Sequence, residues 1–296
     1  MVSLEGRTIR AALRSASAAL HRNGIETPWL DSVVLLCHAL QISKERLFAR
    51  LDDPLHASPL HSLTDAVNRR LAGEPVSYIR GIKEFYGREF SVDRRVMVPR
   101  PETETLVETA LELIDADPTI TRVHDCCSGS GCVAVTLALE RPQLQLSASD
   151  VSQAALEVCS ANVRHLAAGS VEVYHSDLLQ SVPGRFDLIV ANPPYVTDDE
   201  VDSMLRSGWP EPEVSLAGGP DGLRLIRRLA AESIDHLGMN RYLVLEGAFD
   251  QRASVFNVFH HSGLRDVDSR ADLGGRDRVY LGRRIAKEDD SDTGGV

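Results

Sequence analysis

Residues 186–195 read Phe-Asp-Leu-Ile-Val-Ala-Asn-Pro-Pro-Tyr, an apolar run that stops at an amide, two prolines and an aromatic ring. A short, continuous, β-prone run of this kind is typical of a strand that is covered on both faces of a parallel sheet. The two prolines restrict the backbone angle φ and have no N–H group, so the loop after the strand offers carbonyl acceptors. The stretch therefore predicts a buried parallel strand that runs into a rigid loop.

The loop itself has groups that suit a planar amide or amine. The side-chain carbonyl of Asn192 and the backbone carbonyl of Pro193 can accept from one NH2 group, and the Tyr195 ring can face a flat substrate. The alternative is an ordinary turn in which Asn192 caps and the prolines stop the strand. Four residues in this order favour a site, with Asn192, Pro193 and Tyr195 as catalytic residues and Pro194 as a further substrate contact.

Composition narrows the class of protein. The chain has 296 residues, enough for two domains, and a formal net charge of -11, which argues against a stable nucleic-acid partner. No segment approaches the ~18 uninterrupted apolar residues of a membrane span, and the first residues lack a signal-peptide run, so a cytoplasmic protein is expected. Its five cysteines have no paired metal-binding spacing, which predicts reduced cysteines and no metal.

The first part of the chain predicts a small helical bundle over residues 1–75. Three helix starts carry a capping residue, at Thr27-Pro28, Ser43 and Ser58-Pro59. Residues 76–98 alternate in polarity around glycines and predict a β-hairpin linker. Residues 99–284 then form the second domain, and the acidic, Gly-ended segment 285–296 predicts a disordered tail.

A glycine turn follows the first predicted strand of the second domain. Residues 123–131 read Val-His-Asp-Cys-Cys-Ser-Gly-Ser-Gly and precede an apolar helix, a pattern in which backbone N–H groups can approach a nucleotide-like ligand. The next strand ends at Asp150, which can accept from ribose hydroxyls or cap the following helix from Ser152. The third strand ends at Ser176-Asp177-Leu178, where the adenine ring of a bound ligand would lie.

Together these motifs resemble class I S-adenosylmethionine-dependent methyltransferases that act on a nitrogen of a planar group. Two further stretches, 78–104 with Val98-Pro99-Arg100-Pro101-Glu102-Thr103-Glu104 and 211–223 with Leu216-Ala217-Gly218-Gly219-Pro220-Asp221-Gly222-Leu223, resemble the HemK/PrmC family. Members of that family methylate glutamine in peptide chain release factors. Asn-Pro-Pro-Tyr also occurs in adenine methyltransferases, so the flanking stretches carry the narrower resemblance.

The resemblance implies an α/β fold, a Rossmann-like seven-stranded sheet with one antiparallel strand. It also implies S-adenosyl-L-methionine as cofactor, release factors as protein substrate, and residues 192–195 around the glutamine. The implied cofactor residues are Cys127, Ser128, Gly129, Ser130, Gly131, Asp150, Asp177, Leu178 and Asn192. The sequence departs from the family pattern in three places: the Cys126-Cys127 pair, Leu178 where an aromatic residue is common, and Gly238-Met239-Asn240.

An amide nitrogen is a weak nucleophile, because its lone pair is delocalised into the carbonyl. Two carbonyl acceptors can orient it and stabilise its developing positive charge, so no strong base is required. His124 and Glu246 lie in or at the end of predicted strands and are interpreted as structural rather than as bases. The alternatives are a nucleic-acid adenine N-methyltransferase, which would need a basic cleft, and a non-catalytic cofactor-binding adaptor.

Overall fold

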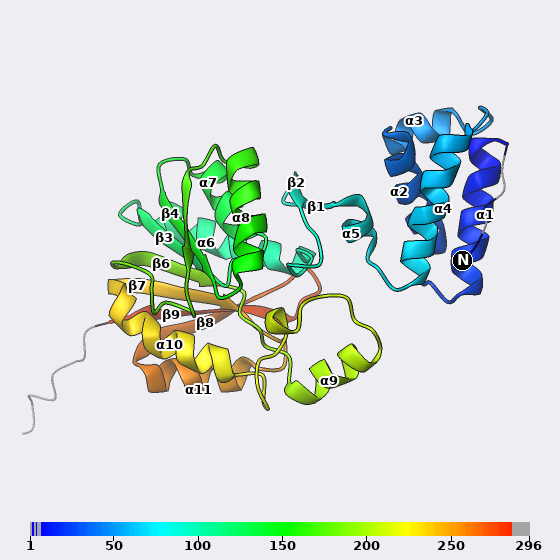
Figure 1. The fold of residues 1–296 in the computed structure, drawn as a ribbon. Coiled ribbons are helices and arrows are strands. Elements are labelled where there is room, and N and C mark those ends of the chain that lie inside the picture. Colours follow the sequence, from blue (N-terminus) through cyan, green and yellow to red (C-terminus); the bar gives the residue numbers. More distant parts are fainter. Residues whose placement is uncertain (1, 3, 5–6, 286–296) are drawn as a thin grey trace, which may run out of the picture. The chain divides into compact units, whose positions relative to one another are not determined.

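The fold is described from a computed structural model, which covers residues 2, 4 and 7–285 (Figure 1). The chain divides into two compact units, one up to residue 83 together with 208–210, and one that comprises residues 84–207 and those from 211 onwards. We describe each unit by itself. All but the first residue of the predicted tail 285–296 lies outside the described residues.

The first unit is a helical bundle. Its helices are α1 (Ile9–Arg22), α2 (Pro28–Leu40), α3 (Lys44–Ala49), α4 (Ala57–Leu71) and α5 (Val76–Arg80). Ser43 caps α3 as predicted, since its hydroxyl accepts from the Arg46 N–H. The predicted start at Ser58 is wrong: His56 is the cap of α4 and Pro59 lies in the first turn. Proline is tolerated there because the first N–H groups of a helix have no partner within it.

The linker differs from the predicted hairpin over residues 76–98. Its first part is helix α5, which begins after Pro75 and ends at Gly81, where φ is 74°. Proline and a left-handed glycine are typical boundaries of a short helix, and they outweigh the alternation in polarity. Only β1 (Ile82–Phe85) and β2 (Arg88–Ser91) form the two-stranded sheet, and the division between the units falls within β1.

The second unit contains the predicted seven-stranded sheet. The strands are β3 (Arg122–Cys126), β4 (Gln145–Asp150), β5 (Val171–His175), β6 (Phe186–Ala191), β7 (Leu237–Glu246), β8 (Leu264–Ala271) and β9 (Asp277–Arg284). Their spatial order is β5-β4-β3-β6-β7-β9-β8. The pairs from β5 to β7 are parallel, and β9 is antiparallel to both of its neighbours. This confirms the prediction of a single antiparallel strand.

Helices cover both faces of this sheet (Figure 1). The cluster on one face includes residues of α6 (Glu104–Ala116), α7 (Cys132–Glu140) and α8 (Gln153–Leu166). The cluster on the other face includes residues of α10 (Arg224–His236) and α11 (Arg252–Ser262). The remaining helical segments are η1 (Pro101–Thr103), α9 (Asp198–Arg206) and η2 (Glu213–Ser215).

The strand order determines where in the sheet a ligand site is expected. The chain runs outward from β3 through β4 to β5, then returns to β6 on the other side of β3. The carboxyl ends of adjacent parallel strands at such a reversal leave a crevice, which is the usual ligand position in open α/β sheets. The loops after β3, β4, β5 and β6 therefore meet at one edge of the sheet.

Candidate active site

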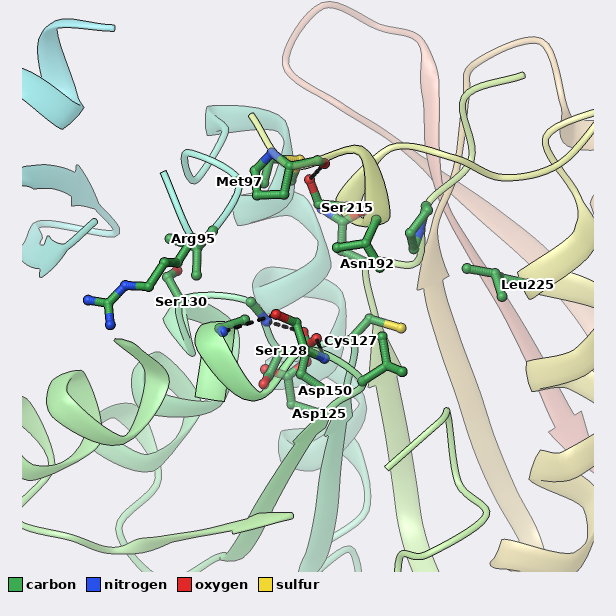
Figure 2. Close-up of a pocket in the computed structure, with 18 of the residues that line it drawn as sticks. Arg95, Met97, Asp125, Cys127, Ser128, Ser130, Asp150, Asn192, Ser215 and Leu225 are labelled. Atoms are coloured by element: carbon green, nitrogen blue, oxygen red, sulfur yellow. Dashed lines mark hydrogen bonds between the residues drawn. The ribbon is translucent and has the colours of Figure 1, made fainter. Parts of the chain in front are cut away.

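A cavity of about 610 Å³ lies at this edge, within the second unit (Figure 2). Most of the residues predicted for the site line it, although they come from four different loops. These are Cys127, Ser128, Gly129, Ser130, Asp150, Asp177, Leu178, Asn192 and Pro194. Gly131, Pro193 and Tyr195 were also predicted, but they do not line this cavity.

The glycine turn after β3 has the backbone conformation that its sequence suggests. Cys127, Gly129 and Gly131 all have positive φ, and the Ser128 N–H donates to the Ser149 carbonyl at 2.9 Å. Gly131 is the residue that precedes α7, and a Cβ atom there would lie 2.7 Å from the Cys159 sulfur. Its small size therefore serves the close packing of α7 and α8 behind the loop.

Asp150 holds the glycine turn as well as lining the cavity. One carboxylate oxygen accepts from the Gly129 N–H and the other from the Ser152 N–H, both at 2.9 Å. The cap of α8 is the Ser152 hydroxyl, which accepts from the Ala155 N–H. Burial raises the pKa of Asp150. Each carboxylate oxygen has more than one acceptor site, so Asp150 can still accept from a ligand.

Asp125 was quoted in the glycine motif but not predicted as a site residue. It is buried in β3, lines the cavity, and accepts from the Ala134 N–H at 3.0 Å. Burial raises its pKa to about 7. The signal that could have identified it is a carboxyl group inside an otherwise buried strand directly before a glycine turn, because a buried acid needs a functional or structural partner.

Carboxylates outnumber cations around the cavity. Asp125, Asp150, Asp177 and Glu213 line it, against the cations Arg95 and Arg224. Arg95 is already paired with Asp93 and Glu157, and in Figure 2 its side chain extends away from the labelled aspartates. Asp177 is likewise paired with Arg228 at 3.0 Å, so Asp125, Asp150 and Glu213 remain as the acidic groups of the cavity. The cavity is therefore suited to a ligand that carries positive charge.

Asn192 faces the cavity with a defined pattern of hydrogen bonds. Its Nδ2 donates to the Thr103 hydroxyl at 3.2 Å. In the part of the chain that the structure describes, no hydrogen bond uses Asn192 Oδ1 or the Pro193 carbonyl. The oxygen that the sequence predicts as an acceptor is therefore the free end of this amide.

The hydroxyl of Tyr195 is held by a buried carboxyl group. It donates to Glu246 Oε1 at 3.0 Å, and the residue lines a second cavity of about 1080 Å³. Tyr195 is not among the residues that line the first cavity, and its role as a substrate contact stays a prediction.

The glycines of residues 216–223 serve the same loop. Val196 pairs with Leu216 and Gly218 through backbone hydrogen bonds of 3.1 and 2.8 Å. A Cβ atom on Gly218 would lie 2.8 Å from Tyr195 Cα, and one on Gly222 would lie 2.3 Å from the Tyr195 carbonyl oxygen. The glycine-rich stretch is therefore needed to let this segment approach the 192–195 loop closely.

The two candidate bases, His124 and Glu246, lie outside the first cavity. His124 is buried between the Ser147 and Ser149 hydroxyls at 2.8 and 2.9 Å, and burial lowers its pKa to about 3. Neither His124 nor Glu246 lines the first cavity. This agrees with the sequence-based interpretation that neither residue is a general base.

Comparison with known proteins places these features in a family. The family model described as PrmC N-terminal domain matches residues 11–81, and the methyltransferase small domain matches residues 103–207. The release factor glutamine methyltransferase of Coxiella burnetii is 38% identical over 88% of this chain and 93% of its own. That of Koribacter versatilis is 38% identical over 94% and 99%.

The chain belongs to the release factor glutamine methyltransferase family. Membership in this family confirms the resemblance found in the sequence. A methyltransferase from Pyrococcus furiosus shares the fold, with 14% identity, a TM-score of 0.50, and coverage of 75% of this chain and all of that one. The glycine turn, Asp150 and Asn192 all lie within the matched methyltransferase domain.

The described residues contain neither a membrane-spanning helix nor a metal-binding cluster. None of the helices in residues 7–285 combines the length and apolar character needed to cross a membrane. The same part of the chain has no group of three or more His, Cys, Asp or Glu side chains arranged to hold a metal ion. All five cysteines are free.

Proposed function

We propose that this enzyme transfers the methyl group of S-adenosylmethionine to the side-chain amide nitrogen of the glutamine in the Gly-Gly-Gln motif of peptide chain release factors. The observation that carries this proposal is the free acceptor pair, Asn192 Oδ1 and the Pro193 carbonyl, beside an acidic cavity. The relatives' name, release factor glutamine methyltransferase, supports the same substrate.

The proposed cofactor fits the charge of the cavity. S-adenosylmethionine supplies an electrophilic methyl group on a positively charged sulfur, together with an ammonium group. The surplus of carboxylates favours such a ligand over an anionic one. The residues proposed to hold it are Cys127, Ser128, Gly129, Ser130, Asp150, Asp177 and Leu178.

The proposed mechanism depends on orientation rather than on a base. Asn192 and Pro193 accept the two N–H bonds of the glutamine amide, which fixes the direction of the nitrogen and favours positive charge on it. His124 stays neutral at physiological pH, because burial lowers its pKa to about 3, and it lies outside the cavity. In the proposed mechanism the amide proton passes to water after methyl transfer, without a dedicated side chain.

The adenine methyltransferase alternative would use the same acceptor loop on an exocyclic amine. The formal net charge of -11 disfavours it, since nucleic-acid binding requires clustered lysine and arginine. The proposed partner is thus a protein, with no stable nucleic acid or membrane partner. The proposed location is the cytoplasm, where release factors act on ribosomes.

We also propose that the helical unit binds the release factor. Trp29 and Leu30 at the start of α2 are about half exposed, and neighbouring exposed apolar side chains are typical of interaction surfaces. The double variant Trp29→Ser/Leu30→Ser is expected to raise KM for the intact factor and leave methylation of a short Gly-Gly-Gln peptide unchanged. Equal KM values of the wild type and the double variant for the intact factor would exclude this role for α2.

The central test is mass spectrometry of a release factor incubated with the enzyme and S-adenosylmethionine. We expect a mass increase of one methyl group on the tip glutamine. The matched controls are the same factor with Gln changed to Glu at the tip, and adenine-containing DNA. Methyl incorporation into DNA, or undiminished incorporation into the Glu variant, would show that the acceptor has been wrongly assigned.

A further inference from the structure

Arg100 and Glu211 form an ion pair between two segments that are far apart in the sequence. Arg100 Nη2 donates to both carboxylate oxygens, to Oε1 at 2.8 Å and to Oε2 at 2.7 Å. Glu211 Oε1 also accepts from the Val98 N–H at 2.9 Å, and only 4% of Glu211 is exposed. Separating such a pair is costly, because it leaves a buried charge without its partner. The pair therefore fixes residues 97–103 and residues 211–218 to each other.

Both segments line the first cavity. Met97 and Pro99 line it from the first segment. Pro212 and Ser215 line it from the second. In Figure 2 the labelled Met97 and Ser215 lie away from Asp150. The ion pair therefore joins two parts of the cavity wall that are distinct from the part formed by the glycine turn and Asp150.

The first segment holds the side chain of Asn192. The Thr103 N–H donates to the Arg100 carbonyl at 3.1 Å, which closes the short helix η1. The Thr103 hydroxyl in turn accepts from Asn192 Nδ2 at 3.2 Å. Pro99 and Pro101 restrict φ on both sides of Arg100. Few freely rotating bonds therefore separate Arg100 from the Asn192 side chain.

The second segment holds the other end of the acceptor loop. Helix η2 begins two residues after Glu211, and the Leu216 N–H donates back into it at 2.9 Å. The Leu216 carbonyl accepts from the Val196 N–H at 3.1 Å, and the Gly218 N–H donates to the Val196 carbonyl at 2.8 Å. Val196 lies three residues after Pro193. This pairing therefore supports the part of the loop that follows the second acceptor.

We propose that Arg100 and Glu211 are positioning residues for methyl transfer, because their ion pair fixes the two acceptors of the site relative to each other. This inference rests on the proposed function and deepens it. The first segment supports Asn192 Oδ1, and the second supports the loop that carries the Pro193 carbonyl. One NH2 group can donate to both oxygens only while the spacing of the two segments is kept. Arg100 and Glu211 act through these acceptors and do not touch the substrate.

Loss of the ion pair is expected to lower kcat rather than cofactor affinity. A displacement of about 1 Å in a positioned group can cost roughly 10²-fold in rate, so we expect kcat to fall by roughly 10–100-fold. The glycine turn proposed to hold the cofactor is tied to Asp150 and Ser149 instead, through the Gly129 and Ser128 N–H groups. The Kd for S-adenosylmethionine should therefore stay within about threefold of the wild-type value.

The test variant is Arg100→Met/Glu211→Gln, which removes both charges and so leaves no buried charge unpaired. Its kcat on an intact release factor is measured together with the calorimetric Kd for S-adenosylmethionine. Hydrogen exchange, followed by mass spectrometry, reports on the fragments that contain the Val196 and Gly218 amides and needs no substrate. We expect these amides to exchange roughly 10-fold faster than in the wild type, while the amides of the glycine turn keep their rate.

Two further variants serve as matched comparisons. Arg100→Lys keeps a cation, and since a single nitrogen of Arg100 makes both contacts with Glu211, an ammonium group can replace it in part. This variant should lose less activity than the double variant. Arg88→Met/Glu140→Gln breaks another half-buried ion pair, of 2.6 Å, whose members do not line the first cavity. It should change neither kcat nor the exchange of the loop amides.

Unchanged exchange of the Val196 and Gly218 amides in the double variant would overturn the proposal. An equal rise in the glycine turn, a wild-type kcat, or an equal loss in Arg100→Lys would also overturn it. If the double variant fails to fold, Glu211→Gln alone decides by the same measurements, because it keeps the shape and places an NH2 group against Arg100. Absence of methyl transfer by the wild type would reject the proposed function, and the exchange rates would then decide this inference separately.

Discussion

Replacing Asn192 by Ala tests the acceptor site directly. The change deletes Asn192 Oδ1, one of the two free acceptors, and leaves a substrate N–H without a partner in the cavity. Removing one preorganised hydrogen bond to a transition state typically costs about 2.7–4 kcal/mol, so turnover should fall by roughly 10²–10³-fold. The reaction should persist at this lower rate, because the Pro193 carbonyl remains.

The fold should survive this change. Asn192 is half-buried and contributes one side-chain hydrogen bond, to Thr103, worth about 1 kcal/mol. The loop keeps the backbone hydrogen bonds of Val196 to Leu216 and Gly218, which do not involve the side chain. A typical domain has about 5–15 kcal/mol of stability, so this loss is tolerated.

The assay is the kcat for methylation of an intact release factor, measured with calorimetric affinity for S-adenosylmethionine. Asn257→Ala, an exposed asparagine on α11, is the matched control and should leave kcat unchanged. Asn192→Asp keeps an acceptor but adds negative charge beside the site, so partial activity is expected. A folded Asn192→Ala variant with kcat within about fivefold of wild type would refute the reasoning, since that range is far below the loss of one such bond.

Three further predictions follow from the surroundings of the site. Asp150→Ala should weaken S-adenosylmethionine binding by roughly 1.5–3 kcal/mol, and an unchanged calorimetric affinity in the folded variant would reject its role as a ligand. The buried His124 has a pKa of about 3, against 6.5 for an exposed histidine, so its proton binds more readily in the unfolded state. The free energy of unfolding therefore decreases as pH falls below 6.5. Between pH 6.5 and 5 the free energy of unfolding should fall by about 2 kcal/mol. Denaturant titrations of His124→Gln at several pH values should lack this decrease. An equal decrease in the wild type and the variant would contradict the prediction. Gly222→Ala places a Cβ 2.3 Å from the Tyr195 carbonyl oxygen, which should cost roughly 2–4 kcal/mol in unfolding free energy. Gly275→Ala, also at positive φ but with open space around it, is the control and should cost less.

Some features were predictable from the sequence because they depend on neighbouring residues. The strand Phe186–Ala191 follows from a continuous apolar run, and the cap at Ser43 follows from a hydroxyl directly before a helix. Local patterns also misled where two signals competed. At residues 76–80 the alternation in polarity favoured a strand, but Pro75 and Gly81 bound a helix.

The sequence by itself determined the class of fold, the strand that runs into the 192–195 loop and the family, since these depend on residues close together in the chain. Only the tertiary structure decided how the loop is held. Thr103 and Asn192 are separated by 89 positions, and Tyr195 and Glu246 by 51. The strand order brings them together: Asn192 directly follows β6, and the neighbouring strand β7 ends at Glu246. Hydrogen-bond direction in a buried group depends on all its partners at once, and partners this distant leave no local pattern in the sequence.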